Sequence, residues 1–214
     1  TGGNGFLGRR VVHFLNKIGN DDIVIPSSKK LDLRKIENCK KVVENVDVVF
    51  HLAGHVGGIG LNREKPGELF YDNLIMGTQL LHESKLAGIQ KFVALGTICS
   101  YPKFTQIPFL EENIWNGYPE ETNAPYGLAK KMLLVQSQAY RQQYKFKSIV
   151  IIPTNFYGPN DNFEISSSHV IPALIRKIFN AKKNEDESIV AWGDGSPTRD
   201  FMYVEDTAKG LILA

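Results

Sequence analysis

The chain alternates short apolar runs with segments in which apolar residues recur every three or four positions. The runs predict strands at residues 22–25, 47–52, 91–95, 148–152 and near 189–192. The periodic segments predict helices at residues 6–18, 33–45, 68–87, 125–144, 169–180 and 205–214. This alternation is typical of a parallel sheet with crossover helices. Residues 97–122 predict a long loop, and loops of that length are usually functional.

A glycine turn comes directly before the first predicted helix. Gly2, Gly5 and Gly8 recur at a spacing of three, which allows a tight turn, a close approach to a pyrophosphate and close packing of helix on sheet. The helix N-terminus favours anionic phosphates. Residues 26–30, Pro-Ser-Ser-Lys-Lys, stand where an NAD enzyme usually has an acidic residue, and their hydroxyls and ammonium groups would suit the extra phosphate of NADP. A plain glycine turn and a solvated loop are the alternatives.

We therefore expect the α/β fold class, with a doubly wound parallel sheet of the Rossmann type and a small C-terminal lobe. Residues 1–160 would form the NADP-binding domain, residues 161–199 part of a substrate-binding lobe, and residues 200–214 a return to the first domain. A dinucleotide-binding glycine turn follows a strand, and none precedes Thr1. The chain is therefore expected to be a fragment that lacks the first strand and part of the C-terminal lobe.

Composition narrows the class of protein without identifying the function. The 214 residues, 43% hydrophobic and 22% charged, fit a globular chain. A net charge of +2 without a basic stripe argues against a nucleic-acid partner. The two cysteines have no paired spacing, no apolar stretch is long enough to span a bilayer, and no signal-like start is present. We expect a cytoplasmic protein with no membrane partner.

A tyrosine and a lysine one helical turn apart form the first candidate catalytic pair. Lys130 lies four residues after Tyr126 in a predicted helix, so both side chains project from one face. Tyrosine has an ordinary pKa of about 10, and a nearby ammonium would stabilise its phenolate. Thr97 follows a predicted strand at its carboxyl end, and its hydroxyl would hydrogen-bond a carbonyl oxygen that Tyr126 protonates. The Tyr126/Lys130 pair alone would also fit a helix surface.

Two further residues suit chemistry beyond hydride transfer. Cys99 lies two residues after Thr97, and a thiol serves as a base when cationic groups lower its pKa. His169 heads a predicted helix and would be the matching acid. A packed free cysteine and a solvated surface histidine are the alternatives.

Two other histidines raise the question of a metal site. His51 and His55 are four residues apart, a spacing that binds zinc when both lie on one helical face. Here they fall at a strand end and in a glycine-rich loop, without a glutamate after His51 or an evident third ligand. We expect no metal, and residues 51–54 are expected to border the cofactor.

Several motifs together resemble the extended short-chain dehydrogenase/reductases. They are the glycine turn, residues 51–54, Asn73 with Gly77 and Thr78, and the set of Thr97, Tyr126 and Lys130. Within that group the chain closely resembles the GDP-L-fucose synthase family, in residues 56–59, 96–103, 122–126, 155–163 and 168–174. The cysteine loop and the helix of His169 are much more specific to this family than the Tyr/Lys pair.

The resemblance implies a two-part reaction. The family converts GDP-4-keto-6-deoxy-mannose to GDP-L-fucose by epimerising C3 and C5 and then reducing the C4 ketone with NADPH, so NADP(H) is the implied cofactor. The C4 carbonyl acidifies both neighbouring C–H bonds, and the family gives the roles of base and acid to the residues that match Cys99 and His169. Tyr126, held by Lys130, would polarise the ketone and protonate the C4 oxygen.

The resemblance also implies binding residues. The substrate's GDP part would be held by Lys177, Trp192 and Arg199. The cofactor would be bordered by Gly2, Gly3, Asn4, Gly5, Phe6, Leu7, Gly8, Leu95, Gly96, Thr97, Ile98, Lys130, Pro153, Thr154, Asn155, Phe156 and His169. In this family the helices matching residues 68–87 and 125–144 form a dimeric four-helix bundle, so a homodimer is implied.

Three positions depart from the family pattern. Thr97 stands where serine is frequent, Lys177 where arginine is frequent, and Asn4 where some members have a binding arginine. The change at Asn4 leaves NAD open beside NADP, and the change at Lys177 trades a bidentate fork for a point charge. Another NAD(P)-dependent nucleotide-sugar epimerase or dehydratase and a catalytically silent NADP-binding protein are the alternative functions.

Overall fold

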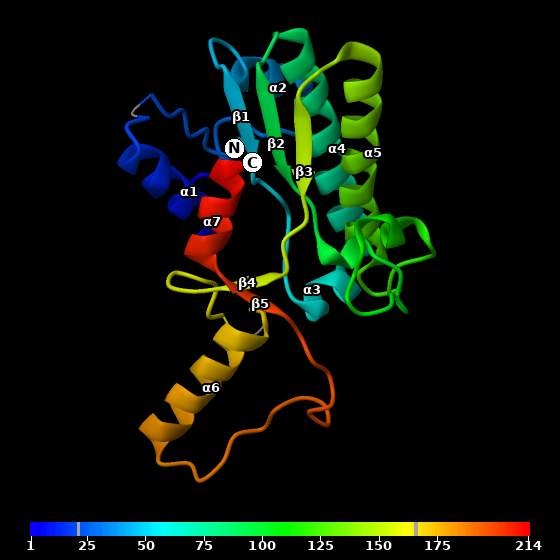
Figure 1. Ribbon diagram of the computed structural model, residues 1–214. Helices are drawn as coiled ribbons and strands as arrows, with labels where there is room; N and C mark the ends of the chain where they lie inside the picture. The colour runs from blue at the N-terminus through cyan, green and yellow to red at the C-terminus, as the bar shows by residue number, and fades with distance from the viewer. Residues whose placement is uncertain (21, 165–166) are drawn as a thin grey trace.

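A parallel sheet forms the centre of the fold in the computed structural model, which describes residues 1–20, 22–164 and 167–214 (Figure 1). Strands β1 (Val48–His51), β2 (Lys91–Leu95) and β3 (Ser148–Ile151) lie in the order β1-β2-β3. Val49 lies opposite Phe92 and Val93 opposite Ile149. Parallel neighbours need crossover connections, which helix α4 (Pro66–Leu86) and helix α5 (Ala124–Tyr144) supply.

Helices cover both faces of this sheet and enclose two cores. Helices α2 (Ile36–Val42), α4 and α5 lie on one face, and α1 (Phe6–Lys17) and α7 (Val204–Leu213) on the other (Figure 1). Successive side chains of a strand point to opposite faces. Phe92 and Ala94 therefore pack with Leu80 and Leu133, whereas Val93 packs in the second core. The predicted doubly wound α/β arrangement is confirmed.

The remaining elements lie beyond the carboxyl ends of the strands. They are the short helix α3 (Ile59–Glu64), the 3-10 turns η1 (Ile98–Ser100) and η2 (Glu111–Trp115), the strands β4 (Asn155–Tyr157) and β5 (Phe201–Tyr203), and helix α6 (Val170–Asn184). Strands β4 and β5 pair in parallel. Helix α6 projects away from the central sheet, and the chain returns through β5 to place α7 beside α1 (Figure 1).

Two predicted strands are wrong. Residues 22–25 form no strand, and Val24 and Ile25 are 63% and 37% exposed. Residues 189–192 form none either, and Val190 and Trp192 are 76% and 81% exposed. In both segments the apolar residues suggest a strand, but no described strand pairs with either of them, and a strand is stable only with a partner.

The predicted helices are found with shifted ends. The helix expected at 33–45 is confined to α2, and the one expected at 169–180 extends to Asn184 in α6. Helix α3 and strands β4 and β5 fall between the predicted elements, because elements of three to six residues are too short to show a period. No helix in the described part of the chain is long and apolar enough to cross a membrane.

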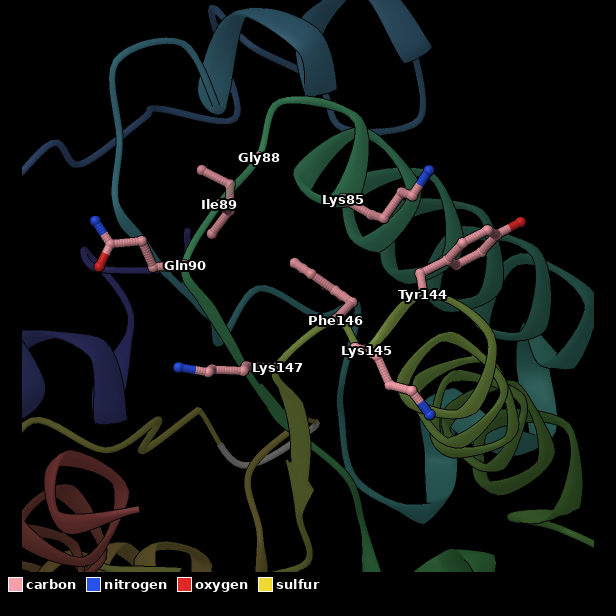
Figure 2. A pocket seen from close by; sticks show the side chains of 8 residues that line it. All are labelled: Lys85, Gly88, Ile89, Gln90, Tyr144, Lys145, Phe146 and Lys147. Carbon is pink, nitrogen blue, oxygen red and sulfur yellow. The ribbon is translucent and has the colours of Figure 1, made fainter.

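One hollow lies at the amino-terminal end of the sheet, away from the ends where ligands of such folds bind. Its volume is about 370 Å³, and it lies between the ends of α4 and α5 and the starts of β2 and β3. Figure 2 shows that the amino groups of Lys85, Lys145 and Lys147 point away from one another. They do not converge on a common point, so the hollow is not arranged to bind an anion.

Candidate active site

The glycine turn meets the loop after β1 at the carboxyl edge of the sheet. A Cβ atom on Gly2 would lie 2.6 Å from the backbone nitrogen of Ala53, and Gly2 has a φ of +74°. Strands β2 and β3 end at the same edge, where a Cβ on Gly96 would lie 2.9 Å from the side chain of Ile152. Ligands of open α/β sheets bind outside this edge.

The turn itself fits a pyrophosphate. The nitrogen of Gly5 donates to the oxygen of Gly2 at 2.9 Å, and a Cβ on Gly8 would lie 2.0 Å from that oxygen, so only glycine fits there. No side chain among the described residues caps the N-terminus of α1, and its first turn holds no acidic residue. Its backbone N–H groups are therefore available to an anionic group of a dinucleotide.

The turn after β2 is docked on the first turn of α5. The hydroxyl oxygen of Thr97 accepts from the nitrogen of Cys99 at 3.2 Å and so shapes η1. The hydroxyl of Ser100 donates to the carbonyl of Gly127 at 2.8 Å. A Cβ on Gly127 would lie 2.1 Å from the carbonyl oxygen of Cys99. These contacts bring Tyr126, next to Gly127, up to Thr97.

The phenol of Tyr126 is held in its protonated form. Burial raises the pKa of Tyr126, and a negative charge on Cys99 raises it further. A hydrogen bond from Thr97 acts in the opposite direction, because it favours the phenolate. At neutral pH the hydroxyl therefore carries its proton.

Lys130 is buried one turn further along α5. It is 5% exposed, and burial lowers the pKa of its ammonium to about 8. A Cβ on Gly54 would lie 3.5 Å from its Nζ, so the ammonium lies against the loop after β1. Within the described residues Lys130 is not among the groups that shift the pKa of Tyr126. The expected electrostatic support of the phenolate by Lys130 is therefore not seen in this arrangement.

Asn73 fixes the loop that Lys130 faces. Its Nδ2 donates to the carbonyls of His55 and Leu69, both at 2.8 Å, and its Oδ1 accepts from the nitrogen of His55 at 3.2 Å. A buried amide with both ends satisfied holds its neighbours rigidly. The loop after β1 is thereby tied to α4.

The two candidate histidines have separate partners. The Nδ1 of His51 lies 2.9 Å from the hydroxyl of Thr1, and burial lowers the pKa of His51 well below its usual range. The Nδ1 of His55 lies 2.9 Å from a carboxylate oxygen of Asp72. In the described ranges, no group of three or more histidine, cysteine, aspartate and glutamate side chains is placed to hold a metal ion.

Cys99 and His169 lie on different elements. Cys99 is partly buried in η1, and burial raises the pKa of its thiol. His169 is exposed at the start of α6. The nitrogen of Gly58, in the loop after β1, donates to the carbonyl of Ser167 at 3.3 Å, so the chain just before α6 is joined to that loop. Among the described residues no hydrogen bond joins His169 to Cys99.

The three residues expected to hold the GDP part lie beyond β4. The Nζ of Lys177 donates to the carbonyl of Val190 at 2.8 Å and lies 5.0 Å from the ring centre of Trp192. A hollow of about 280 Å³ adjoins Lys177, between α6 and residues 186–190. Arg199 lies close enough to Cys99 for its charge to lower the pKa of the thiol. Lys177 therefore lies next to Trp192, whereas Arg199 lies near Cys99.

The segment after β3 completes the edge. Residues 153–156 begin two positions after the last residue of β3. Asn155 begins β4, and its Nδ2 donates to the carbonyl of Asp200 at 3.3 Å. Phe156 packs against Phe6, the first residue of α1, with ring centres 5.7 Å apart. The cofactor segments expected at 1–8 and 153–156 therefore lie next to each other.

Two supporting residues were not expected from the sequence. Gly127 permits the docking of α5, and Glu120 accepts three hydrogen bonds in the loop before that helix. A glycine directly after a candidate catalytic residue was an available signal of close approach. An acidic side chain just before a helix was a signal of a fixed N-terminal turn.

Known proteins resemble the whole chain. The profile of the NAD dependent epimerase/dehydratase family matches residues 1–214. A GDP-L-fucose synthase of Sinorhizobium fredii is 38% identical over all of this chain and 68% of its own length. GDP-L-fucose synthase 1 of Arabidopsis thaliana is 36% identical over all of this chain and 67% of its own length.

A solved structure of a similar protein has the same fold. A GDP-L-fucose synthetase from Naegleria fowleri bound to NADP superposes with a TM-score of 0.89 at 32% identity, over 99% of this chain and 70% of that one. The chain spans about two thirds of the length of these curated relatives. The fold, the glycine turn and the full-length family match together establish that this chain belongs to the NAD dependent epimerase/dehydratase family.

Proposed function

We propose that this chain carries the active site of a GDP-L-fucose synthase. The reaction epimerises C3 and C5 of GDP-4-keto-6-deoxy-D-mannose and reduces C4 with NADPH to give GDP-L-fucose. The observation that carries the proposal is that one turn, η1 with its cap, presents both Thr97 and Cys99 beside Tyr126. A reductase needs only the threonine and tyrosine, whereas inversion next to the ketone also needs a base.

The ketone would be held by two hydroxyls. Thr97 and Tyr126 donate to the C4 oxygen, and the raised pKa of Tyr126 keeps its proton available until negative charge develops on that oxygen. A bound nicotinamide would supply the hydride to C4. Lys130 carries its positive charge below a pH of about 8 and holds the ribose hydroxyls beside the loop of Gly54.

Inversion would use the thiol and the imidazole. Cys99 would act as its thiolate, a form that the positive charge of Arg199 favours and that burial opposes. The thiolate removes the proton from the carbon next to the ketone, and the electron pair of the broken C–H bond moves onto the C4 oxygen, which Tyr126 stabilises. His169 then gives a proton to the opposite face of that carbon. Before the second exchange the thiol returns its proton to solvent and the imidazole takes one up. The two exchanges, at C3 and C5, then change configuration without any net oxidation or reduction.

The remaining assignments concern binding. The family implies a nicotinamide cofactor, and we assign NADP(H) because Lys29 and Lys30 follow the region where an acidic residue would select NAD. For the substrate, Lys177 and Arg199 suit the phosphates and the exposed ring of Trp192 suits the guanine. These residues support a GDP-sugar site that spans α6 and η1.

The organisation of the chain is assigned in the same way. Residues 1–160 are the NADP-binding domain, 161–199 belong to the substrate-binding lobe, and 200–214 return to the first domain, in line with the course of α6 and α7 in Figure 1. We assign a homodimer formed through α4 and α5, which expose Tyr71 and Val135 at 58% and 41%. A cytoplasmic location completes the proposal.

The test is NADPH oxidation on addition of GDP-4-keto-6-deoxy-mannose to the purified protein. The proposal predicts one NADPH oxidised per GDP-L-fucose formed. An epimerase or dehydratase that keeps its cofactor would change the sugar without net NADPH oxidation, and a silent binding protein would do neither. Absence of NADPH oxidation would therefore contradict the proposal.

A further inference from the structure

The loop before α5 is held by a carboxylate that the proposed reaction does not use. Glu120 accepts from the nitrogen of Thr122 at 3.1 Å, from the nitrogen of Asn123 at 3.1 Å and from the Nδ2 of Asn123 at 2.7 Å. Both of its carboxylate oxygens are engaged. Because hydrogen bonds to an ionised acceptor are the stronger ones, this carboxylate fixes the turn of residues 120–123.

This turn sets where α5 begins. The carbonyl of Asn123 accepts from the nitrogen of Gly127 at 2.8 Å, which is the first backbone bond of the helix. Gly127 lies against the carbonyl of Cys99, and its own carbonyl accepts from Ser100. A continuous series of contacts therefore leads from Glu120 through Asn123 and Gly127 to η1.

The charge of Glu120 also reaches the thiol. It raises the pKa of Cys99, in the same direction as burial. The other groups around the thiol are the hydroxyl of Thr97 and the guanidinium of Arg199, which lower that pKa, and the phenol of Tyr126 on α5. The pKa of the Cys99 thiol therefore reports whether the charge of Glu120 is in place.

We propose that Glu120 is a positioning residue that holds the first turn of α5, and with it Tyr126, against the turn that carries Thr97 and Cys99. Its catalytic consequence rests on the proposed function. The effect of the carboxylate's charge on the thiol of Cys99 does not rest on that function, and it is measured on the protein without substrate.

The chain offers a matched control in the next residue. The carboxylate of Glu121 pairs with Lys103 at 2.8 Å on the surface, where its side chain is 69% exposed. Glu120→Gln removes the charge and keeps one acceptor oxygen for the turn. Glu120→Ala removes both, and Glu121→Gln removes a neighbouring charge that does not hold α5.

The first readout is the pH dependence of alkylation of Cys99 by iodoacetamide. Peptide mass spectrometry separates it from Cys39, which is fully buried. In Glu120→Gln the midpoint should fall by roughly 0.5 pH unit, since one negative charge near the thiol is removed. In Glu121→Gln the midpoint of alkylation should equal that of the unaltered protein. An unchanged midpoint in Glu120→Gln, or an equal shift in Glu121→Gln, overturns the proposal.

The second readout is steady-state reduction. Glu120→Ala should lower kcat about 10-fold with the KM for NADPH within about 2-fold, and Glu120→Gln should recover most of the loss, as expected for misplaced catalytic groups. A kcat of Glu120→Ala equal to that of the unaltered protein overturns the proposal. If the unaltered protein does not reduce the ketone, the proposed function fails, whereas the thiol titration still decides the role of Glu120.

Discussion

Gly127 and Cys99 meet backbone to backbone: a Cβ atom on Gly127 would lie 2.1 Å from the carbonyl oxygen of Cys99. The hydroxyl of Ser100 locks the contact through its bond to the carbonyl of Gly127 at 2.8 Å. Helix α5 therefore contacts η1 as closely as two backbones allow. The candidate proton donor Tyr126 is next to this contact, so its position depends on it.

A methyl group at this contact should separate the two elements. Gly127→Ala is expected to lower the rate of ketone reduction about 100-fold, because reacting groups are displaced. It should also reduce the free energy of unfolding by about 1–3 kcal/mol, since the site is overpacked. Steady-state kinetics and urea unfolding measure the two effects.

Gly210→Ala is the matched control. Gly210 lies inside α7, and a Cβ there would have nothing within 4 Å. Removing glycine from a helix interior should raise the free energy of unfolding by about 0.5–1 kcal/mol without changing activity. Equal losses of activity in Gly127→Ala and Gly210→Ala would show that activity does not depend on the contact between Gly127 and Cys99.

Removal of the phenolic hydroxyl should stop reduction selectively. Tyr126→Phe is expected to lower the rate by about 10²–10⁴-fold, the usual contribution of a positioned acid. NADPH affinity, measured by fluorescence titration, should change less than about 2-fold because the ring remains. A variant that reduces the ketone at the original rate would remove Tyr126 from its role.

The buried ammonium of Lys130 should lower the free energy of unfolding. Its pKa is lowered from 10.5 to about 8 by burial, so between these values the unfolded chain binds a proton that the folded chain does not. The free energy of unfolding should therefore rise with pH from about 8 to 10.5, and the full penalty applies below pH 8. Lys130→Met should be about 1–3 kcal/mol more stable at pH 7.

The measurement is urea unfolding of both proteins across this pH range. The difference between them should shrink as the pH rises, and the variant should lack the rise due to Lys130. The rate of reduction in the unaltered protein should fall as the pH passes about 8, since the ammonium is lost. A difference in stability that does not vary with pH would mean that the ammonium is not desolvated.

Replacement of the thiol should separate inversion from reduction. Cys99→Ser keeps the size of the side chain and removes the acidic thiol, so inversion at C3 and C5 should be lost, while NADPH affinity should stay within about 2-fold. The configuration of the sugar is read by NMR. GDP-L-fucose formed at the original rate would exclude Cys99 as the base.

The predictability of the fold depends on where each strand finds its partner. Residues 91–95 were predicted with the bounds of β2, because a central strand is apolar on both faces and can be recognised by its own residues. Residues 22–25 and 189–192 are also apolar, but no described strand pairs with them. Pairing is decided by segments far away in the chain, and no local pattern records it.

The predictability of the site has the same limit. The spacing of Tyr126 and Lys130 and the place of Thr97 after a strand follow from local geometry, and the structure brings Thr97 and Tyr126 together. The orientation of Lys130 toward Gly54 and the anchoring role of Glu120 depend on how α5 docks. Docking is a property of the assembled chain, so these two features required the structure.

The most direct test of the central claim is solvent exchange at the sugar. GDP-4-keto-6-deoxy-mannose is incubated with the protein and NADPH in D₂O, and the product is examined by NMR. Because each inversion replaces a carbon-bound proton with one from solvent, the account predicts GDP-L-fucose with deuterium at both C3 and C5. A C4-reduced product without deuterium at these carbons would show that Cys99 and His169 perform no inversion, and would contradict the account.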